Sequence, residues 1–154
     1  MEYVIIKWLH ILSSTFLFGT GVGSAFLMFT ANRSQNVRHM YFALRHVVIA
    51  DWVFTAPSAA FQLASGLYLT RLGGFSLTNT WIAAALCLYV LIGACWLPVV
   101  WMQITMRDMA ALALSKKKEL PDRFWIYDRW WIILGSLAFP AMLVVFWLMV
   151  AKPA

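Results

Sequence analysis

Four long apolar runs are the feature of this sequence that most restricts its fold. They cover residues 3–30, 40–72, 79–106 and 124–151. Each is longer than the roughly 20 apolar residues with which an α-helix crosses a bilayer, whereas a strand of a membrane β-barrel has only about 10 residues of alternating character. The sequence therefore predicts an all-α fold, in which residues 1–154 form a single domain built as a four-helix transmembrane bundle.

The composition excludes a soluble protein. Hydrophobic residues make up 63% of the chain and charged residues only 12%, against about 25% charged residues in soluble domains. The formal net charge of +6 is of a size often associated with nucleic-acid binding. Most of the basic residues, however, lie in short segments beside the apolar runs, where they contact lipid headgroups. We therefore expect the lipid bilayer, and no nucleic acid, as a partner.

The basic residues also predict an orientation. Most of them lie in or near the loops at 31–39 and 107–123, and the opposite side of the bundle has only Lys7, Arg71 and Lys152. An excess of Lys and Arg marks the cytoplasmic side of a membrane protein. We therefore predict a multi-pass protein of the bacterial inner membrane with both termini on the periplasmic side. The second basic loop is long enough to continue the third helix by one or two turns.

A row of polar side chains follows one face of the second span. It consists of Asp51, Thr55, Ser58, Gln62 and Ser65. Helical geometry keeps this spacing within a stripe about 80° wide, and in lipid such a stripe must turn into the bundle. Two interpretations are open, because the stripe is either a set of hydrogen bonds between helices or a path for protons or substrate. In the second interpretation Asp51 is the catalytic residue.

Pro57 lies inside this row. Proline has no N–H and its ring collides with the carbonyl group four residues earlier, which here belongs to Val53. The sequence therefore predicts a kink in the second span.

His10 is the ionisable residue of the first span for which a cofactor role is plausible. Imidazole is the usual axial ligand of haem iron, and the small residues Ser14 and Gly21 leave room on this helix for a flat group or a close neighbour. Gln62 and Met142 lie at the same level of other spans, and Met142 is a candidate for the second axial position. His10 is therefore either a haem ligand within this set of five residues or a hydrogen-bonding partner of another helix.

His46 is an alternative iron ligand. By helical rise, His10 lies about 10 Å to one side of the bilayer centre and His46 about 15 Å to the other. Two axial ligands must reach the same iron atom, so the two histidines cannot hold one haem together. His46 therefore marks a separate, alternative site.

Three short motifs carry a resemblance to known families. They are Lys-Trp-Leu-His-Ile at residues 7–11, the stretch 50–58 with Pro57, followed by Ser65-Gly66, and Val-Ala-Lys-Pro at 150–153. The chain resembles a widespread bacterial group of predicted integral membrane proteins of unknown function. That group is distantly similar to the HemJ-type protoporphyrinogen oxidases, which are four-helix membrane proteins that bind haem b.

The resemblance implies a haem b-binding, redox-linked protein, either an oxidoreductase or an electron-transfer subunit, with His10 aligned to the haem-ligating histidine. The oxidases carry histidine and lysine in their third span, and residues 79–106 of this chain contain neither. The resemblance therefore extends to haem binding rather than to oxidation of protoporphyrinogen. The alternative is a cofactor-free membrane subunit or small transporter, in which Asp51 has a packing or proton-relay role. Four helices enclose little interior, so we also expect a homo-oligomer or a place in a larger membrane complex.

Overall fold

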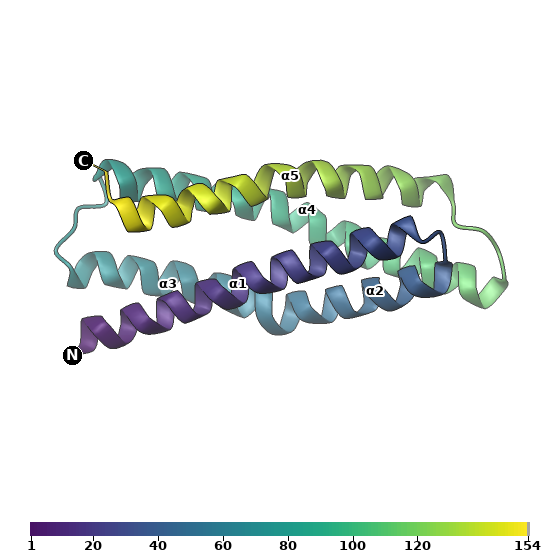
Figure 1. Ribbon diagram of the computed structural model, residues 1–154, viewed down its shortest axis with the longest axis horizontal. Coiled ribbons are helices and arrows are strands. Elements are labelled where there is room, and N and C mark those ends of the chain that lie inside the picture. Colours follow the sequence, from purple (N-terminus) through teal and green to yellow (C-terminus); the bar gives the residue numbers. More distant parts are fainter. Residues whose placement is uncertain (154) are drawn as a thin grey trace.

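The computed structural model describes residues 1–153, and every regular element in that range is helical (Figure 1). The elements are α1 (Glu2–Arg33), α2 (Val37–Ala50), the π-helical turn η1 (Asp51–Thr55), α3 (Ala56–Leu72), α4 (Thr80–Lys116) and α5 (Asp122–Ala151). α2, η1 and α3 follow one another without a break and form a single span. The four resulting helices are long and apolar enough to cross a membrane, which confirms the predicted all-α, four-span architecture.

The third span is longer than the sequence predicted. α4 does not end near residue 106 but continues to Lys116, so most of the predicted loop at 107–123 is helix. The added residues are rich in Ala, Leu and Met, which are strong helix formers. The helix ends where Lys117 adopts the left-handed conformation, with φ of 51°, and the connection to α5 is short.

The two termini and the 73–79 connection lie at one end of the bundle, and the connections after α1 and α4 lie at the other (Figure 1). The loop at 34–36 and the Lys116–Lys118 run therefore share an end, which we call the basic end. Its assignment to the cytoplasm remains a prediction.

The tightest packing is found toward the basic end. There the side chains of α1, α2, α4 and α5 form one buried cluster, whose fully buried members include Met28, Met40, Leu44, Met106 and Phe124. A polar pair is buried at the same end, where Nδ2 of Asn32 donates to Oδ1 of Asp128 at 2.7 Å. The guanidinium of Arg33 lies 4.0 Å from the other carboxylate oxygen of Asp128. This end of the bundle is therefore held by both apolar and polar contacts.

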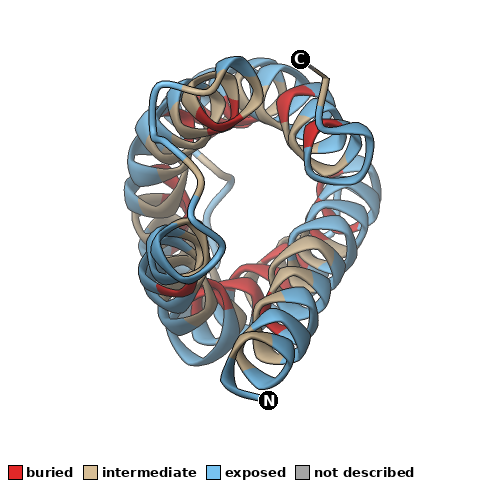
Figure 2. Cartoon of the chain, turned by 90° about the vertical axis from the view of Figure 1, so that its left-hand side faces the viewer, coloured by how far each residue is buried: buried red, intermediate tan, exposed pale blue. Residues whose placement is uncertain are grey.

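Toward the terminal end the bundle divides into two helix pairs. α3 packs on α1, and α4 packs on α5, with little contact between α3 and α4. One hydrogen bond links the two pairs, from the hydroxyl of Tyr89 to the carbonyl oxygen of Ala59 at 2.6 Å. Viewed from this end, the helices are arranged around a common centre (Figure 2).

The second span changes its helical geometry just before Pro57. In η1 the N–H of Ala56 bonds to the carbonyl oxygen of Asp51, five residues earlier, instead of the usual four. A wide turn moves backbone carbonyls away from the proline ring, which would otherwise collide with one of them. The irregularity predicted at Pro57 is thus a π-turn, and it places Asp51 and Thr55 at the centre of the membrane span.

Cysteine labelling on intact cells tests the orientation. In a background with Cys87→Ala and Cys95→Ala, we expect a membrane-impermeant maleimide to label Ser76→Cys and to spare Lys117→Cys, because basic loops stay in the cytoplasm. Both positions are in exposed connections. Labelling of both variants after the cells are permeabilised is the control, and labelling of Lys117→Cys alone in intact cells would reverse the orientation.

Candidate functional site

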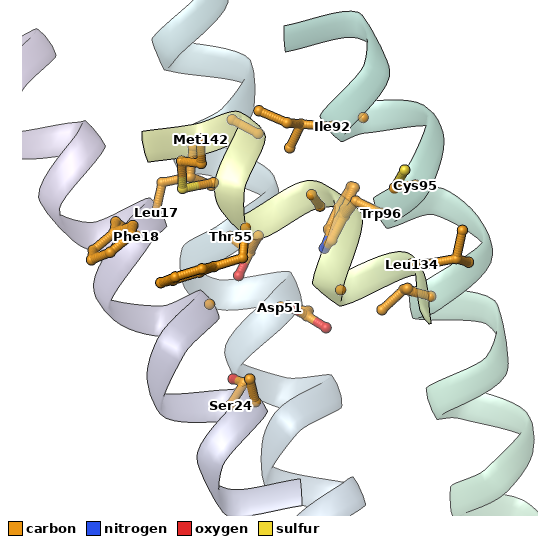
Figure 3. A pocket seen from close by; sticks show the side chains of 18 of the residues that line it. Leu17, Phe18, Ser24, Asp51, Thr55, Ile92, Cys95, Trp96, Leu134 and Met142 are labelled. Carbon is orange, nitrogen blue, oxygen red and sulfur yellow. The ribbon is translucent and has the colours of Figure 1, made fainter. Parts of the chain in front are cut away.

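A cavity of about 190 Å³ lies in the middle of the bundle. Selected residues within the segments 17–25 of α1, 89–103 of α4 and 131–142 of α5 form its wall, together with Asp51 and Thr55 of η1 and Ala59 of α3. Most of the lining side chains are apolar or aromatic. Figure 3 shows Trp96 reaching from α4 into the space in front of η1, where Asp51 and Thr55 lie. The cavity is therefore an apolar chamber with a small polar region at η1.

Glycines on three helices create the space. Gly21, Gly93 and Gly135 all line the cavity, and a Cβ atom added to any of them would meet no neighbouring atom within 4 Å. Small residues in membrane helices usually permit two helix backbones to come into contact. These three make no such contact, so helix packing does not account for them. Their effect is to leave room for another molecule.

The carboxyl group of Asp51 is held by Gln103, which is held in turn by Trp131. With its amide oriented to satisfy both neighbours, Gln103 donates from Nε2 to Oδ2 of Asp51 at 2.8 Å and accepts at Oε1 from the indole N–H of Trp131 at 3.2 Å. All three residues are buried. This chain of contacts ties η1 to α4 and α5 and fixes the direction of the carboxyl group.

Thr55 is the second polar group at the cavity. Its side chain is only 6% exposed, and its hydroxyl oxygen makes no well-formed hydrogen bond within residues 1–153, although the carboxyl group of Asp51, one turn earlier, lies close enough to interact with it. A buried polar atom without a partner costs about 1–3 kcal/mol. The hydroxyl of Thr55 is therefore a contact that a bound molecule can complete.

His10 lies outside the cavity lining and is bound to α3. Its Nδ1 is 2.7 Å from the hydroxyl oxygen of Ser65, and its Nε2 is 2.8 Å from the amide nitrogen of Gln62. The Ser65 hydroxyl donates its proton to the carbonyl oxygen of Phe61 at 2.6 Å and so accepts from Nδ1–H of His10. Nε2 then accepts from Gln62. The hydrogen bonds thus assign a neutral imidazole with both nitrogens engaged.

Gly66 of α3 allows the ring of His10 on α1 to come close to the backbone of α3. A Cβ atom on Gly66 would lie 3.2 Å from Cε1 of His10, which is tighter than an ordinary contact. Ser13, on the same helix as His10, adds a bond from its hydroxyl to the carbonyl oxygen of Ser58 at 3.1 Å. α1 and α3 are therefore joined along one line of polar contacts. The stripe on the second span faces inward throughout, but only Asp51 and Thr55 reach the cavity.

The five residues predicted to surround a haem do not form one site. Gly21 and Met142 line the central cavity, and His10 and Gln62 bond to each other between α1 and α3. Ser14 donates to the carbonyl oxygen of Ile11 on its own helix at 2.7 Å. The sequence placed Gln62 and Met142 at the level of His10 on other spans, and Ser14 and Gly21 along its own helix, but could not tell that these residues belong to different contacts.

His46 lies on an exposed face of α2. Its Nδ1 is 2.8 Å from the carbonyl oxygen of Phe42, one turn earlier, and the two rings are in contact with centroids 4.1 Å apart. No three His, Cys, Asp or Glu side chains come together as metal ligands anywhere in residues 1–153. His46 as an iron ligand therefore remains a prediction.

Sequence reasoning missed three of the residues that build the site: Gln103, Trp131 and Trp96. Apart from Asn79 at its first position, Gln103 is the only amide side chain in the third apolar run, and an amide in lipid needs a hydrogen-bond partner, so this signal was available. Trp96 lies too far from either interface for an aromatic belt, which was a second signal. The role of Trp131 could not be recognised in the sequence, because a tryptophan near the end of a span is ordinarily an interfacial residue.

The contact between His10 and Gly66 predicts a stability difference between two glycine variants. We expect Gly66→Ala to destabilise the protein by about 1–2 kcal/mol, because His10 is held by two hydrogen bonds and cannot move aside. Gly23→Ala is the matched control, since an added methyl group meets nothing there and alanine favours helix. Thermal unfolding in detergent measures the two variants. In a His10→Ala background the cost at Gly66 should vanish, and a cost that persists would contradict the contact.

The sequence matches a family model described as "Predicted integral membrane protein (DUF2269)" over residues 4–153. No curated protein and no solved structure matches the chain. The family description names no activity and no cofactor, so haem b and the likeness to the HemJ-type oxidases remain predictions. The match covers nearly the whole chain and agrees with the four apolar helices. The chain therefore belongs to the DUF2269 family and is a multi-pass integral membrane protein.

Proposed function

We propose that this protein binds a small, mostly apolar molecule inside the membrane, in the central cavity, and that Asp51 and Thr55 provide its polar contact. This places it in the class of small transporters or cofactor-free membrane subunits. The observation that carries the proposal is a glycine-lined cavity in mid-span with a buried hydroxyl that makes no well-formed hydrogen bond.

The size of the cavity supports a ligand of one ring with small substituents. An apolar cavity of roughly 150 Å³ in a soluble protein is sufficient to bind benzene. The cavity here, at about 190 Å³, is somewhat larger and has aromatic walls. Ligand pockets of this kind are mostly apolar, with a few polar groups that fix the orientation of the ligand.

The interhelical contacts of Asp51 do not exclude this role. Gln103 contacts Oδ2 of Asp51, and the same carboxyl group also lines the cavity. Ionisable residues inside a membrane are costly to maintain and mark functional sites by default. Asp51 therefore serves as both a link between helices and the polar end of the binding site.

Quenching of tryptophan fluorescence by bromobenzene tests the proposal, because Trp96 and Trp131 line the cavity. We expect saturable quenching in the purified protein and its loss in Gly21→Leu, where the leucine fills the cavity. Gly19→Leu is the matched control, since Gly19 has open space on the same helix but does not line the cavity.

Both leucine variants increase helix propensity and add the same apolar volume. Non-specific quenching by bromobenzene dissolved in detergent is therefore alike in the two. Equal quenching of Gly21→Leu and Gly19→Leu would reject the central cavity as a binding site.

Haem b ligation by His10 is a second hypothesis, supported by one observation. Histidines that bind metals usually donate their other ring N–H to a neighbouring group, as Nδ1–H of His10 does to Ser65. The arrangement described here does not fit an iron atom at Nε2, because Gln62 occupies that nitrogen and Gly66 lies against the ring. A haem there would require Gln62 to move away; when bound, it would supply one-electron redox chemistry.

Optical absorption of protein expressed with ample haem decides between the two hypotheses. The haem hypothesis requires a Soret band that is lost in His10→Ala and kept in His46→Ala. From the two hydrogen bonds at His10 we expect a colourless protein. A Soret band in the wild type that disappears with His10 would establish the haem site and contradict this expectation.

A further inference from the structure

We propose that the ligand of the central cavity is a hydrophobic cation, such as a quaternary ammonium ion or a protonated amine attached to an aromatic or aliphatic group. This inference rests on the proposed function, because it specifies the chemistry of the molecule that binds there. It is carried by the charges and the aromatic rings that line the cavity.

The charge of the lining favours a cation. Among the described residues that form the wall, Asp51 is the only acidic one, and none is Lys, Arg or His. An anion placed beside Asp51 would therefore meet a like charge with no compensating group. A cation gives the carboxylate a partner in a setting where an unpaired charge is expensive.

The aromatic rings of the wall give a second, independent reason. Five aromatic side chains line the cavity: Phe18, Tyr89, Trp96, Trp131 and Phe139. The face of an aromatic ring attracts a cation, most strongly where water is excluded, and groups of aromatic rings are how proteins commonly bind quaternary ammonium groups. The cavity therefore offers a cation several aromatic rings as well as one carboxylate.

Contacts within the protein keep these groups in place. Phe18 and Phe139 stack with centroids 5.5 Å apart and so connect α1 to α5 at the cavity wall. The hydroxyl of Tyr89 donates to the carbonyl oxygen of Ala59, so the ring is the part of Tyr89 that is left to contact a ligand. Gln103, supported by Trp131, holds Oδ2 of Asp51. The carboxyl group is thus oriented before a ligand arrives, which lowers the cost of binding.

The experiment compares two probes of nearly identical shape. Benzyltrimethylammonium carries a positive charge, and neopentylbenzene has carbon in place of its nitrogen. Each probe is titrated against bromobenzene, and the recovery of tryptophan fluorescence measures its binding. The protein variants are Asp51→Asn, which removes the charge but keeps the shape, and Asp108→Asn as control, because Asp108 is exposed, pairs with Arg107 and does not line the cavity.

We expect Asp51→Asn to weaken the binding of benzyltrimethylammonium by at least about tenfold, and to change the binding of neopentylbenzene by less than about twofold. Asp108→Asn should leave the binding of both probes unchanged. Unchanged binding of neopentylbenzene also shows that the cavity of the Asp51→Asn variant is intact. Asp51→Glu, which keeps the charge, should retain more cation binding than Asp51→Asn.

The possible failures separate the two proposals. If neopentylbenzene displaces bromobenzene but benzyltrimethylammonium does not, the cavity binds apolar molecules and the cation inference is wrong. If Asp51→Asn weakens the binding of both probes equally, the cation inference is likewise wrong, because Asp51 then has a structural role. If bromobenzene itself does not occupy the cavity, the proposed function fails as well.

Discussion

Lipid offers no hydrogen-bond partners, and this constraint determines how the four helices are joined. Apart from Thr55, the polar side chains that join the spans find their partners on another helix or on their own backbone. Three contacts between helices result, at successive levels of the bundle. Asn32 meets Asp128 near the basic end, Gln103 meets Asp51 in the middle, and Gln62 meets His10 toward the terminal end. The apolar surface alone would not specify which helix faces which, since lipid solvates it equally well.

These contacts also explain why the bundle is dense at one end and open at the other. Near the basic end, large side chains such as Phe124, Met40 and Met106 fill the space between four helices. Toward the terminal end, the polar bonds of His10 and Ser13 bind α3 to α1, while α4 pairs with α5. The cavity lies where the joined helices separate into pairs, and Asp51 lies at this division.

The sequence predicted the class of fold and four spans because long apolar runs have no other stable arrangement in a bilayer. It also predicted that the polar stripe faces inward, since the period of the helix alone decides that. It could not show which residues of other helices these polar side chains bond to, because periodicity describes one helix at a time. His10 has the same pattern whether it faces a cofactor or Gln62. The closeness of Gly66 to its ring appears only when α1 and α3 are placed together.

The predicted extension of α4 by one or two turns is longer in the structure for a related reason. Basic residues and hydropathy locate the boundary of the membrane, but a helix ends only where its backbone must change conformation, here at Lys117. At the centre of the molecule, Asp51, Trp96 and the glycines each gave a signal in the sequence, yet an empty volume belongs to no single residue. It is defined by side chains from different helices that fail to meet, and no pattern along one chain reports it.

The π-turn has a consequence for which changes in chain length the protein can tolerate. It contains one residue more than an α-helical turn would need, and this extra residue sets the rotation of α2 relative to α3. Deleting a residue of the regular helix between Ala56 and Gln62 would rotate one half of the span by about 100° against the other. Either Asp51 would then leave Gln103 and the cavity, or Gln62 would leave His10. Point substitutions on the lipid-facing side of this segment cost little stability by comparison. The segment is therefore constrained in length more than in composition.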